Sequence, residues 1–234
     1  MAVYYNSGRI ITDGLVLCLD AANRKSYPTT GTTWTDLSGL GNTGTLTNGP
    51  TYSSENGGSL SFDGANDYVV LTNTASLRPG SANFTAEAWI YRSGSPGGGG
   101  TNATILGTAW SGGTPTGAWL FDMDGGNIRF LIWSSLIVQS TTPILTGKWY
   151  HIAVSRIGTT FSLYINGILE STTTSSLNAN NSTYSIYIGR YYDPYGFNGY
   201  FNGRISVVRL YNNRGLTASE ISQNFNATRG RYGI

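Results

Sequence analysis

Trp149-Tyr150-His151-Ile152-Ala153-Val154-Ser155-Arg156 is the stretch that indicates the fold class most clearly. Successive side chains of a β-strand point to opposite faces, so this stretch divides into two sets. One face would hold Tyr150, Ile152 and Val154, and the other would hold Trp149, His151, Ala153 and Ser155. Both sets are partly apolar, which predicts a central strand that is covered on both sides.

The residues that follow predict a β-hairpin. Asn166-Gly167 separates Phe161-Ser162-Leu163-Tyr164-Ile165 from Ile168-Leu169, and Asn-Gly favours the tight turn that joins antiparallel strands. Other short β-like runs lie at residues 15–19, 59–62, 68–71, 84–91, 103–107, 118–123, 128–132, 135–140, 185–189 and 203–211. About a dozen strands with hairpin loops and no repeated unit predict one β-sandwich.

The composition agrees with an all-β domain. Among 234 residues there are 32 Gly and 16 Tyr, charged residues make up only 11%, and the formal net charge is +2. Glu and Lys, which usually cover solvated helices, are nearly absent. A single helix is expected, where the capping box Thr217-Ala218-Ser219-Glu220 precedes Ile221 and Phe225 at i, i+4 spacing.

Several classes of protein are excluded. Cys18 is the one cysteine, so neither an internal disulfide nor a multi-thiolate zinc site can form. No apolar run approaches the roughly 20 residues that span a bilayer, so membrane insertion is not expected. Residues 1–9 do not resemble a secretory signal, and we therefore expect synthesis in the cytoplasm without a cleaved signal peptide.

A series of motifs resembles the laminin-G-like, concanavalin A-like lectin/glucanase superfamily. In chain order they are Phe62-Asp63-Gly64-Ala65-Asn66-Asp67-Tyr68-Val69, Phe84-Thr85-Ala86-Glu87-Ala88-Trp89-Ile90, Trp149-Tyr150-His151-Ile152-Ala153-Val154, Leu163-Tyr164-Ile165-Asn166-Gly167, Phe201-Asn202-Gly203-Arg204-Ile205, Val208-Arg209-Leu210-Tyr211 and Glu220-Ile221. The resemblance implies a jelly-roll β-sandwich of two antiparallel sheets over residues 15–225. Residues 1–14 would then form an N-terminal arm, and residues 226–234 a C-terminal tail.

The flanking sequences are similar to the lectin-like domains of structural proteins in tailed bacteriophages. They are Gly14-Leu15-Val16-Leu17-Cys18-Leu19-Asp20-Ala21-Ala22-Asn23, Trp34-Thr35-Asp36-Leu37-Ser38-Gly39 and Asn224-Phe225-Asn226-Ala227-Thr228-Arg229-Gly230-Arg231-Tyr232-Gly233-Ile234. This resemblance implies a non-enzymatic virion protein, either a capsid decoration or a fibre component, that binds other virion proteins and forms homo-oligomers. A free carbohydrate-binding lectin module is the alternative.

Hydrolysis of glycosides is the main enzymatic alternative, because glucanases share this fold. The glucanase pattern Glu-x-Asp-x-x-Glu is absent, and the four Glu residues lie far apart in the sequence. Asp122 and Asp124 would share one face of a strand, but Asp124 begins a glycine turn and is more simply a turn former. His151 is the only histidine, and its place in a central strand favours a structural role. We therefore expect no enzymatic activity and no catalytic residues.

Calcium is the one metal that the resemblance suggests, because many relatives bind it. Asp63, Asn66 and Asp67 offer clustered oxygen ligands of the kind that Ca²⁺ prefers. The alternative is that Asp63 caps a tight turn and that Asp67 accepts hydrogen bonds from loop amides.

Host-surface glycans are the expected small ligands, and aromatic side chains in loops are the candidates for binding them. The candidate residues are Trp110, Tyr191, Tyr192, Asp193, Tyr195 and Phe197. The alternative is that these side chains pack against neighbouring loops or another subunit.

Arginines gather near the C-terminus, at residues 204, 209, 214, 229 and 231. The motifs of nucleic-acid-binding folds are missing, so a nucleic acid is not expected as a partner. We expect the tail instead to anchor the protein on an acidic protein surface. The anchoring residues would be Arg229, Arg231, Tyr232 and Ile234.

Overall fold

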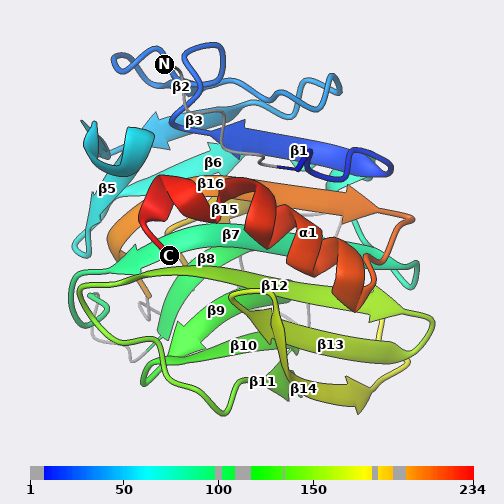
Figure 1. Cartoon of the computed structure of the whole chain (residues 1–234). Helices are drawn as coiled ribbons and strands as arrows, with labels where there is room; N and C mark the ends of the chain where they lie inside the picture. The colour runs from blue at the N-terminus through cyan, green and yellow to red at the C-terminus, as the bar shows by residue number, and fades with distance from the viewer. Residues whose placement is uncertain (1–7, 98–101, 109–116, 134, 181–183, 192–198) are drawn as a thin grey trace.

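A computed structural model describes residues 8–97, 102–108, 117–133, 135–180, 184–191 and 199–234. Two antiparallel sheets of eight strands each pack face to face (Figure 1). This confirms the predicted jelly-roll β-sandwich with a short C-terminal helix.

The first sheet, sheet A, has β16 and β7 at its centre. Its strands in spatial order are β14 (Ile168–Thr174), β13 (Thr160–Ile165), β12 (Trp149–Ile157), β7 (Phe84–Arg92), β16 (Asn202–Asn212), β5 (Ser59–Asp63) and β4 (Thr51–Ser53), with β1 (Leu15–Asp20) also paired to β16.

The second sheet, sheet B, packs against the inner face of sheet A. Its order is β11 (Ser135–Gln139), β10 (Asn127–Ile132), β9 (Trp119–Asp124), β8 (Asn102–Thr108), β15 (Ile186–Ile188), β6 (Tyr68–Leu71), β3 (Gly44–Thr47) and β2 (Thr33–Trp34). The helical segments are η1 (Glu55–Gly57), η2 (Ala75–Leu77), α1 (Ala218–Thr228) and η3 (Arg229–Tyr232). None of the helices in the described ranges is long and apolar enough to cross a membrane.

Strand β12 is covered on both sides, as its alternating sequence predicts. Ile152 and Val154 are buried in the core between the sheets, and Tyr150 packs against that core. On the outer face, Ala153 packs in a second cluster with Ile221 of α1. The strand therefore lies in the middle layer of three.

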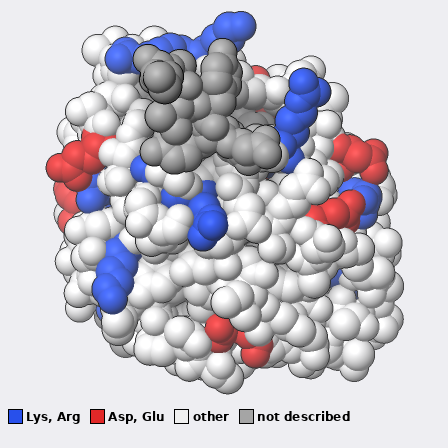
Figure 2. Space-filling view, in the orientation of Figure 1, with Lys and Arg blue, Asp and Glu red and all other residues white. Residues whose placement is uncertain are grey.

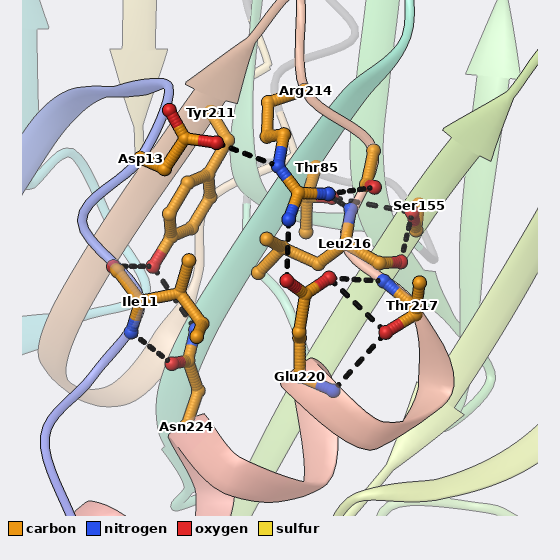
Figure 3. A network of polar contacts seen from close by, with 11 residues as sticks. Ile11, Asp13, Thr85, Ser155, Tyr211, Arg214, Leu216, Thr217, Glu220 and Asn224 are labelled. Atoms are coloured by element: carbon orange, nitrogen blue, oxygen red, sulfur yellow. Dashed lines mark hydrogen bonds and ion pairs between the residues drawn. The ribbon is translucent and has the colours of Figure 1, made fainter.

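The predicted hairpin and helix are both confirmed. Asn166 and Gly167 have φ angles of 52° and 76°, the left-handed values that a two-residue hairpin turn requires. At the start of α1, the Thr217 hydroxyl accepts a hydrogen bond from the Glu220 N–H, and the Glu220 carboxylate accepts one from the Thr217 N–H (Figure 3). This reciprocal pair is the expected capping box.

Helix α1 and η3 lie across the outer face of sheet A (Figure 1). The boundary expected between residues 225 and 226 falls inside α1. Tyr232 is buried, and Arg231 forms an ion pair of 2.8 Å with Asp20 of β1. The tail was expected to dock on another protein, but these two side chains are bound within this domain because sheet A offers an aromatic and an acidic partner. Arg229 and Ile234 are exposed.

The described part of the N-terminal arm also packs on the domain. The Ile11 N–H donates to the side-chain oxygen of Asn224 in α1, at 2.8 Å. The Tyr211 hydroxyl of β16 donates to the Ile11 carbonyl at 2.9 Å (Figure 3). Residues 8–14 are therefore held against α1 and sheet A.

Candidate functional site

Two hollows lie side by side at the end of the sandwich where β10, β12 and β16 finish. The first encloses about 460 Å³ and is lined by residues 75, 78–82, 178, 180, 212 and 213. The second encloses about 400 Å³ and is lined by Gly117, Ile132, Trp133, Leu177, Asn178 and Asn180. The two hollows share Asn178 and Asn180, so residues 177–180 form a ridge between them. We call the two hollows and this ridge the end groove.

The ridge is held firmly by backbone contacts. Gly80 and Ala179 exchange two backbone hydrogen bonds, at 3.3 and 2.9 Å, as in an antiparallel bridge. Ala179 is fully buried, so the side chains on either side of it point outward. Asn178 and Asn180 are accordingly exposed on the ridge. Their side-chain amides make no hydrogen bond within the described residues, which leaves donors and acceptors free for a ligand.

Trp133 forms one wall of the second hollow. Ile132 pairs with Ser135 across the β10–β11 hairpin, so the turn has two residues and Trp133 is the first. Its φ angle is 61° and 42% of its surface is exposed. A left-handed conformation is costly for a bulky residue, by about 1–2 kcal/mol, and Asn or Gly is usual at this turn position. An exposed aromatic ring is thus held in a strained conformation beside two free amides.

This combination suits the recognition of a sugar. Pyranose rings stack on flat aromatic faces, and amide groups satisfy hydroxyls as both donors and acceptors. The second hollow offers Trp133 for stacking, and the ridge offers Asn178 and Asn180 for hydrogen bonding. The end groove can therefore bind a polar ring compound without any charged group in the second hollow.

The sugar-binding residues expected from the sequence do not line the end groove. Trp110, Tyr192, Asp193, Tyr195 and Phe197 lie outside the described residues. Tyr191 is described and half-buried, and its N–H donates to the Gly199 carbonyl at 3.0 Å. These assignments stay predictions. Sequence reasoning missed Trp133, although one signal was present: the gap between two expected strands, 128–132 and 135–140, has two residues and neither is Asn or Gly.

The residues expected to bind calcium are engaged in their own loop. Asp63 Oδ1 accepts the N–H groups of Ala65 and Asn66, at 2.7 and 3.3 Å. Asp67 Oδ2 accepts the N–H of Asp63 at 3.1 Å, and burial raises the pKa of Asp67. Within the described ranges, no three His, Cys, Asp or Glu side chains gather as a metal site would require. These hydrogen bonds give both carboxylates a structural role, and calcium binding stays a prediction.

The two aspartates on the outer face of sheet B are joined by one arginine. Arg129 donates two hydrogen bonds to Asp122, at 3.0 and 2.8 Å, and one of 2.7 Å to Asp124. Asp122 is buried, and burial raises its pKa despite the Arg129 contact. Asp122 and Asp124 do share a face, as expected. Because both carboxylates bind the same guanidinium, neither is free to act as the general acid or nucleophile of a glycosidase.

His151 is buried on the outer face of sheet A, under α1. Its Nε2 lies 3.5 Å from a carboxylate oxygen of Glu87, and its ring packs between Trp89 and Phe225. Glu87 also accepts a hydrogen bond of 2.6 Å from Arg209. His151, Glu87 and Arg209 are all buried. The surroundings of His151 therefore suit the structural role that the sequence favours.

Comparison with known proteins places this sandwich in a family. The family described as the concanavalin A-like lectin/glucanases superfamily matches residues 63–222, which is more than half of the chain. The chain belongs to this superfamily. No curated protein matches the sequence.

Solved structures with the same fold come from several kinds of protein. Domain 4 of an extracellular arabinanase from Geobacillus stearothermophilus, in complex with arabinotriose, is 19% identical with a TM-score of 0.68, over 90% of this chain and 97% of that one. The binding domain of Paraclostridial mosquitocidal protein 1 is 16% identical with a TM-score of 0.69, over 92% of this chain. A Trypanosoma rangeli sialidase is 20% identical with a TM-score of 0.65, also over 92%. The chain spans about half of the mosquitocidal domain, 52%, and a third of the sialidase, 33%.

Proposed function

We propose that this chain is a non-catalytic carbohydrate-binding domain that holds a sugar in the end groove, with one ring stacked on Trp133. The exposed, left-handed Trp133 carries the proposal. A strained conformation persists where the surrounding structure enforces it, and such residues concentrate at binding sites. An Asn or Gly at this position would form the same turn without the strain, so the tryptophan ring itself is the feature to be explained.

The lectin-like fold supports the proposal. Arabinotriose is bound in the arabinanase domain structure, and N-acetylneuraminic acid is bound in the structure of the botulinum neurotoxin serotype D ligand-binding domain. Both share the sandwich at low sequence identity, 19% and 15%. The position of the groove at strand ends also fits, because loops at the end of a rigid sandwich commonly carry binding residues.

A glycan array followed by calorimetry tests the proposal. Stacking of a nucleic-acid base on an aromatic ring is worth about 1–3 kcal/mol, and we expect a sugar ring on Trp133 to contribute a similar amount. The wild-type protein should therefore bind at least one glycan, and Trp133→Ala should lose roughly tenfold in affinity. Ile168→Ala is the matched control, since Ile168 is 69% exposed and lies at the β13–β14 turn, away from the groove. No glycan signal even for multimerised protein, or equal binding by Trp133→Ala, would overturn the proposal.

The absence of catalysis is part of the same proposal. The engagement of Asp122 and Asp124 by Arg129 supports it. Incubation of each bound glycan with the protein should release no reducing sugar. Release that disappears in Asp122→Asn but persists in Ile168→Ala would identify a hydrolase instead.

The virion role is a further part of the proposal and rests on the flanking sequences. A domain displayed in many copies on a particle gains avidity, so that weak contacts with host-surface glycans suffice. Purified particles of a phage that encodes this chain should carry it through sedimentation, in contact with other virion proteins or with further copies of itself. Recovery only from the soluble fraction would favour the free lectin module.

A further inference from the structure

The first hollow of the end groove contains a guanidinium that no carboxylate neutralises. Arg78 lines this hollow, and its Nε and Nη2 atoms donate to the side-chain oxygen and the carbonyl of Asn73, at 3.0 and 2.9 Å. Both acceptors are uncharged. These two bonds fix the guanidinium plane and leave Nη1 without a partner in the described part of the chain. The group is therefore held in place with one of its nitrogens still available.

A second cation lies directly beneath the groove. Arg156 is only 2% exposed, and its Nη1 donates to the carbonyls of Gly80 and Leu177, at 3.2 and 2.9 Å. Gly80 lines the first hollow and Leu177 the second. Nε of Arg156 donates to the Gly158 carbonyl at 2.9 Å, so every acceptor is again uncharged. Burial lowers the pKa of Arg156, and no acidic neighbour opposes that effect.

The walls of the groove add no negative charge. Neither hollow is lined by an Asp or Glu among the described residues. A buried cation in a medium of low dielectric constant exerts its field over a longer distance than an exposed one, because water and salt do not screen it. Arg156 below the ridge and Arg78 in the first hollow therefore make the groove attractive to an anion.

We infer that the end groove selects oligosaccharides that carry a sugar carboxylate, which would bind Arg78 in the first hollow while a neighbouring ring stacks on Trp133 in the second. This inference rests on the proposed function. We expect the anion to be a carboxylate, because guanidinium–carboxylate hydrogen bonds are strong and directional. The ligand must cross the ridge of residues 177–180, so it contains at least two sugar rings. Uronic and sialic acids both supply such a group.

Matched pairs of ligands test the inference. Oligogalacturonate is compared with its carboxyl-reduced form, and sialyllactose with lactose, by calorimetry at low and at high salt. We expect one charged member to bind about tenfold more tightly than its neutral partner, since hydrogen bonds to charged groups are stronger than those between neutral groups. The pair that shows the preference identifies the acid as uronic or sialic. The preference should shrink as salt is added.

Substitution of Arg78 assigns the preference to this residue. Arg78→Gln should reduce the charged-to-neutral affinity ratio to within about twofold, because the charged group that distinguishes the two ligands is gone. Arg78→Lys keeps the charge and should retain part of the preference. Arg24→Gln is the control, because Arg24 is exposed, bonds to Thr29 and does not line the groove. Thermal melting confirms that each variant is folded.

The possible failures are distinguishable. Glycan binding that requires Trp133 but shows no preference for the charged member would overturn the carboxylate inference and leave the proposed function intact. A preference that survives in Arg78→Gln, or tighter binding of a sulfated oligosaccharide than of either acid, would overturn it as well. No binding of any glycan would overturn both.

Discussion

The rings of Trp89 and Tyr232 stack with their centroids 3.9 Å apart and their planes 19° from parallel. Trp89 belongs to β7, near the middle of sheet A, and Tyr232 is the last residue of η3. Trp149 of β12 also contacts this phenol ring, with centroids 4.8 Å apart and the planes tilted by 46°. The C-terminal segment therefore covers an aromatic cluster that sheet A would otherwise expose to water. In Figure 2, which views the molecule from this side, white atoms predominate and the charged residues form small separate groups.

Removal of the Tyr232 ring should destabilise the domain substantially. Tyr232→Ala uncovers Trp89 and Trp149, and we expect a loss of about 3–5 kcal/mol, as for other buried aromatics. Tyr232→Phe keeps the stack and loses the hydrogen bond of 2.9 Å to Ser206, so its cost should be about 1 kcal/mol. Urea denaturation measures both. Equal stability of Tyr232→Ala and wild type would mean that the tail is not docked in solution.

The strain at Trp133 can be separated from the loss of its ring. Trp133→Ala, Trp133→Asn and Trp133→Gly all remove the ring, but only alanine remains unfavourable at a φ angle of 61°. We expect the Asn and Gly variants to be more stable than the Ala variant by about 1 kcal/mol. Thermal or urea unfolding of the three variants checks this order. An alanine variant as stable as the other two would argue against a strained turn.

Stability should fall in acid because of Glu87. Burial by itself raises the pKa of this carboxyl, but His151 and Arg209 outweigh it and lower the pKa to about 2. The folded state therefore favours the ionised form more than the unfolded state does, whose pKa is near 4.5. Glu87 then contributes stability above pH 4.5 that is lost as the pH falls towards 2, on the order of 3 kcal/mol. Urea midpoints across this range measure the loss.

Two variants show whether Glu87 causes this loss. Glu87→Gln should be less stable at pH 7, because it leaves Arg209 buried without its carboxylate, and its stability should change less between pH 4.5 and 2. Asp13→Asn is the control, since the Asp13 side chain is 80% exposed and its ion pair with Arg214 adds little. If the stability of Glu87→Gln falls between pH 4.5 and 2 as much as that of the wild type, the loss is caused by other carboxylates.

The loop of Asp63 and Asp67 should hold its shape without an ion. We expect Asp67→Ala to lose about 1–3 kcal/mol, because the Asp63 N–H loses its acceptor in a partly buried loop. Thermal melting in chelator and in added calcium tests the ion separately. A melting temperature that rises with calcium in the wild type but not in Asp63→Asn would establish the calcium site.

Local patterns predicted most of the fold. The alternation in β12, the Asn166-Gly167 turn and the Thr217–Glu220 capping box each depend on residues close together in the sequence, and each is found in the structure. The docking of the tail was harder to predict, because Tyr232 stacks on Trp89, which lies far away in the sequence. A sequence shows that the tail is aromatic and basic but does not show whether its partner lies in the same domain.

The end groove could not be predicted for a similar reason. Arg156 belongs to strand β12, whereas Arg78 and residues 177–180 come from two separate connections, and only the folded sandwich brings the three together. Backbone carbonyls are the acceptors of Arg156, and these carry no sequence signal. The clustered tyrosines predict sugar-binding residues within 191–197, whereas the described groove depends on one tryptophan in a two-residue turn.

The pairing of β1 with β16 affects how the chain folds during its synthesis on the ribosome. Cys18 lies opposite Arg209, so the first strand of sheet A must wait for its partner until almost the whole described chain has been synthesised. Strand β7 also lacks one of its two neighbours until β16 emerges. Contacts this distant in the sequence form slowly and leave apolar strand edges open in the meantime. The nascent chain should therefore depend on chaperones, and its sheets should close only after translation of β16.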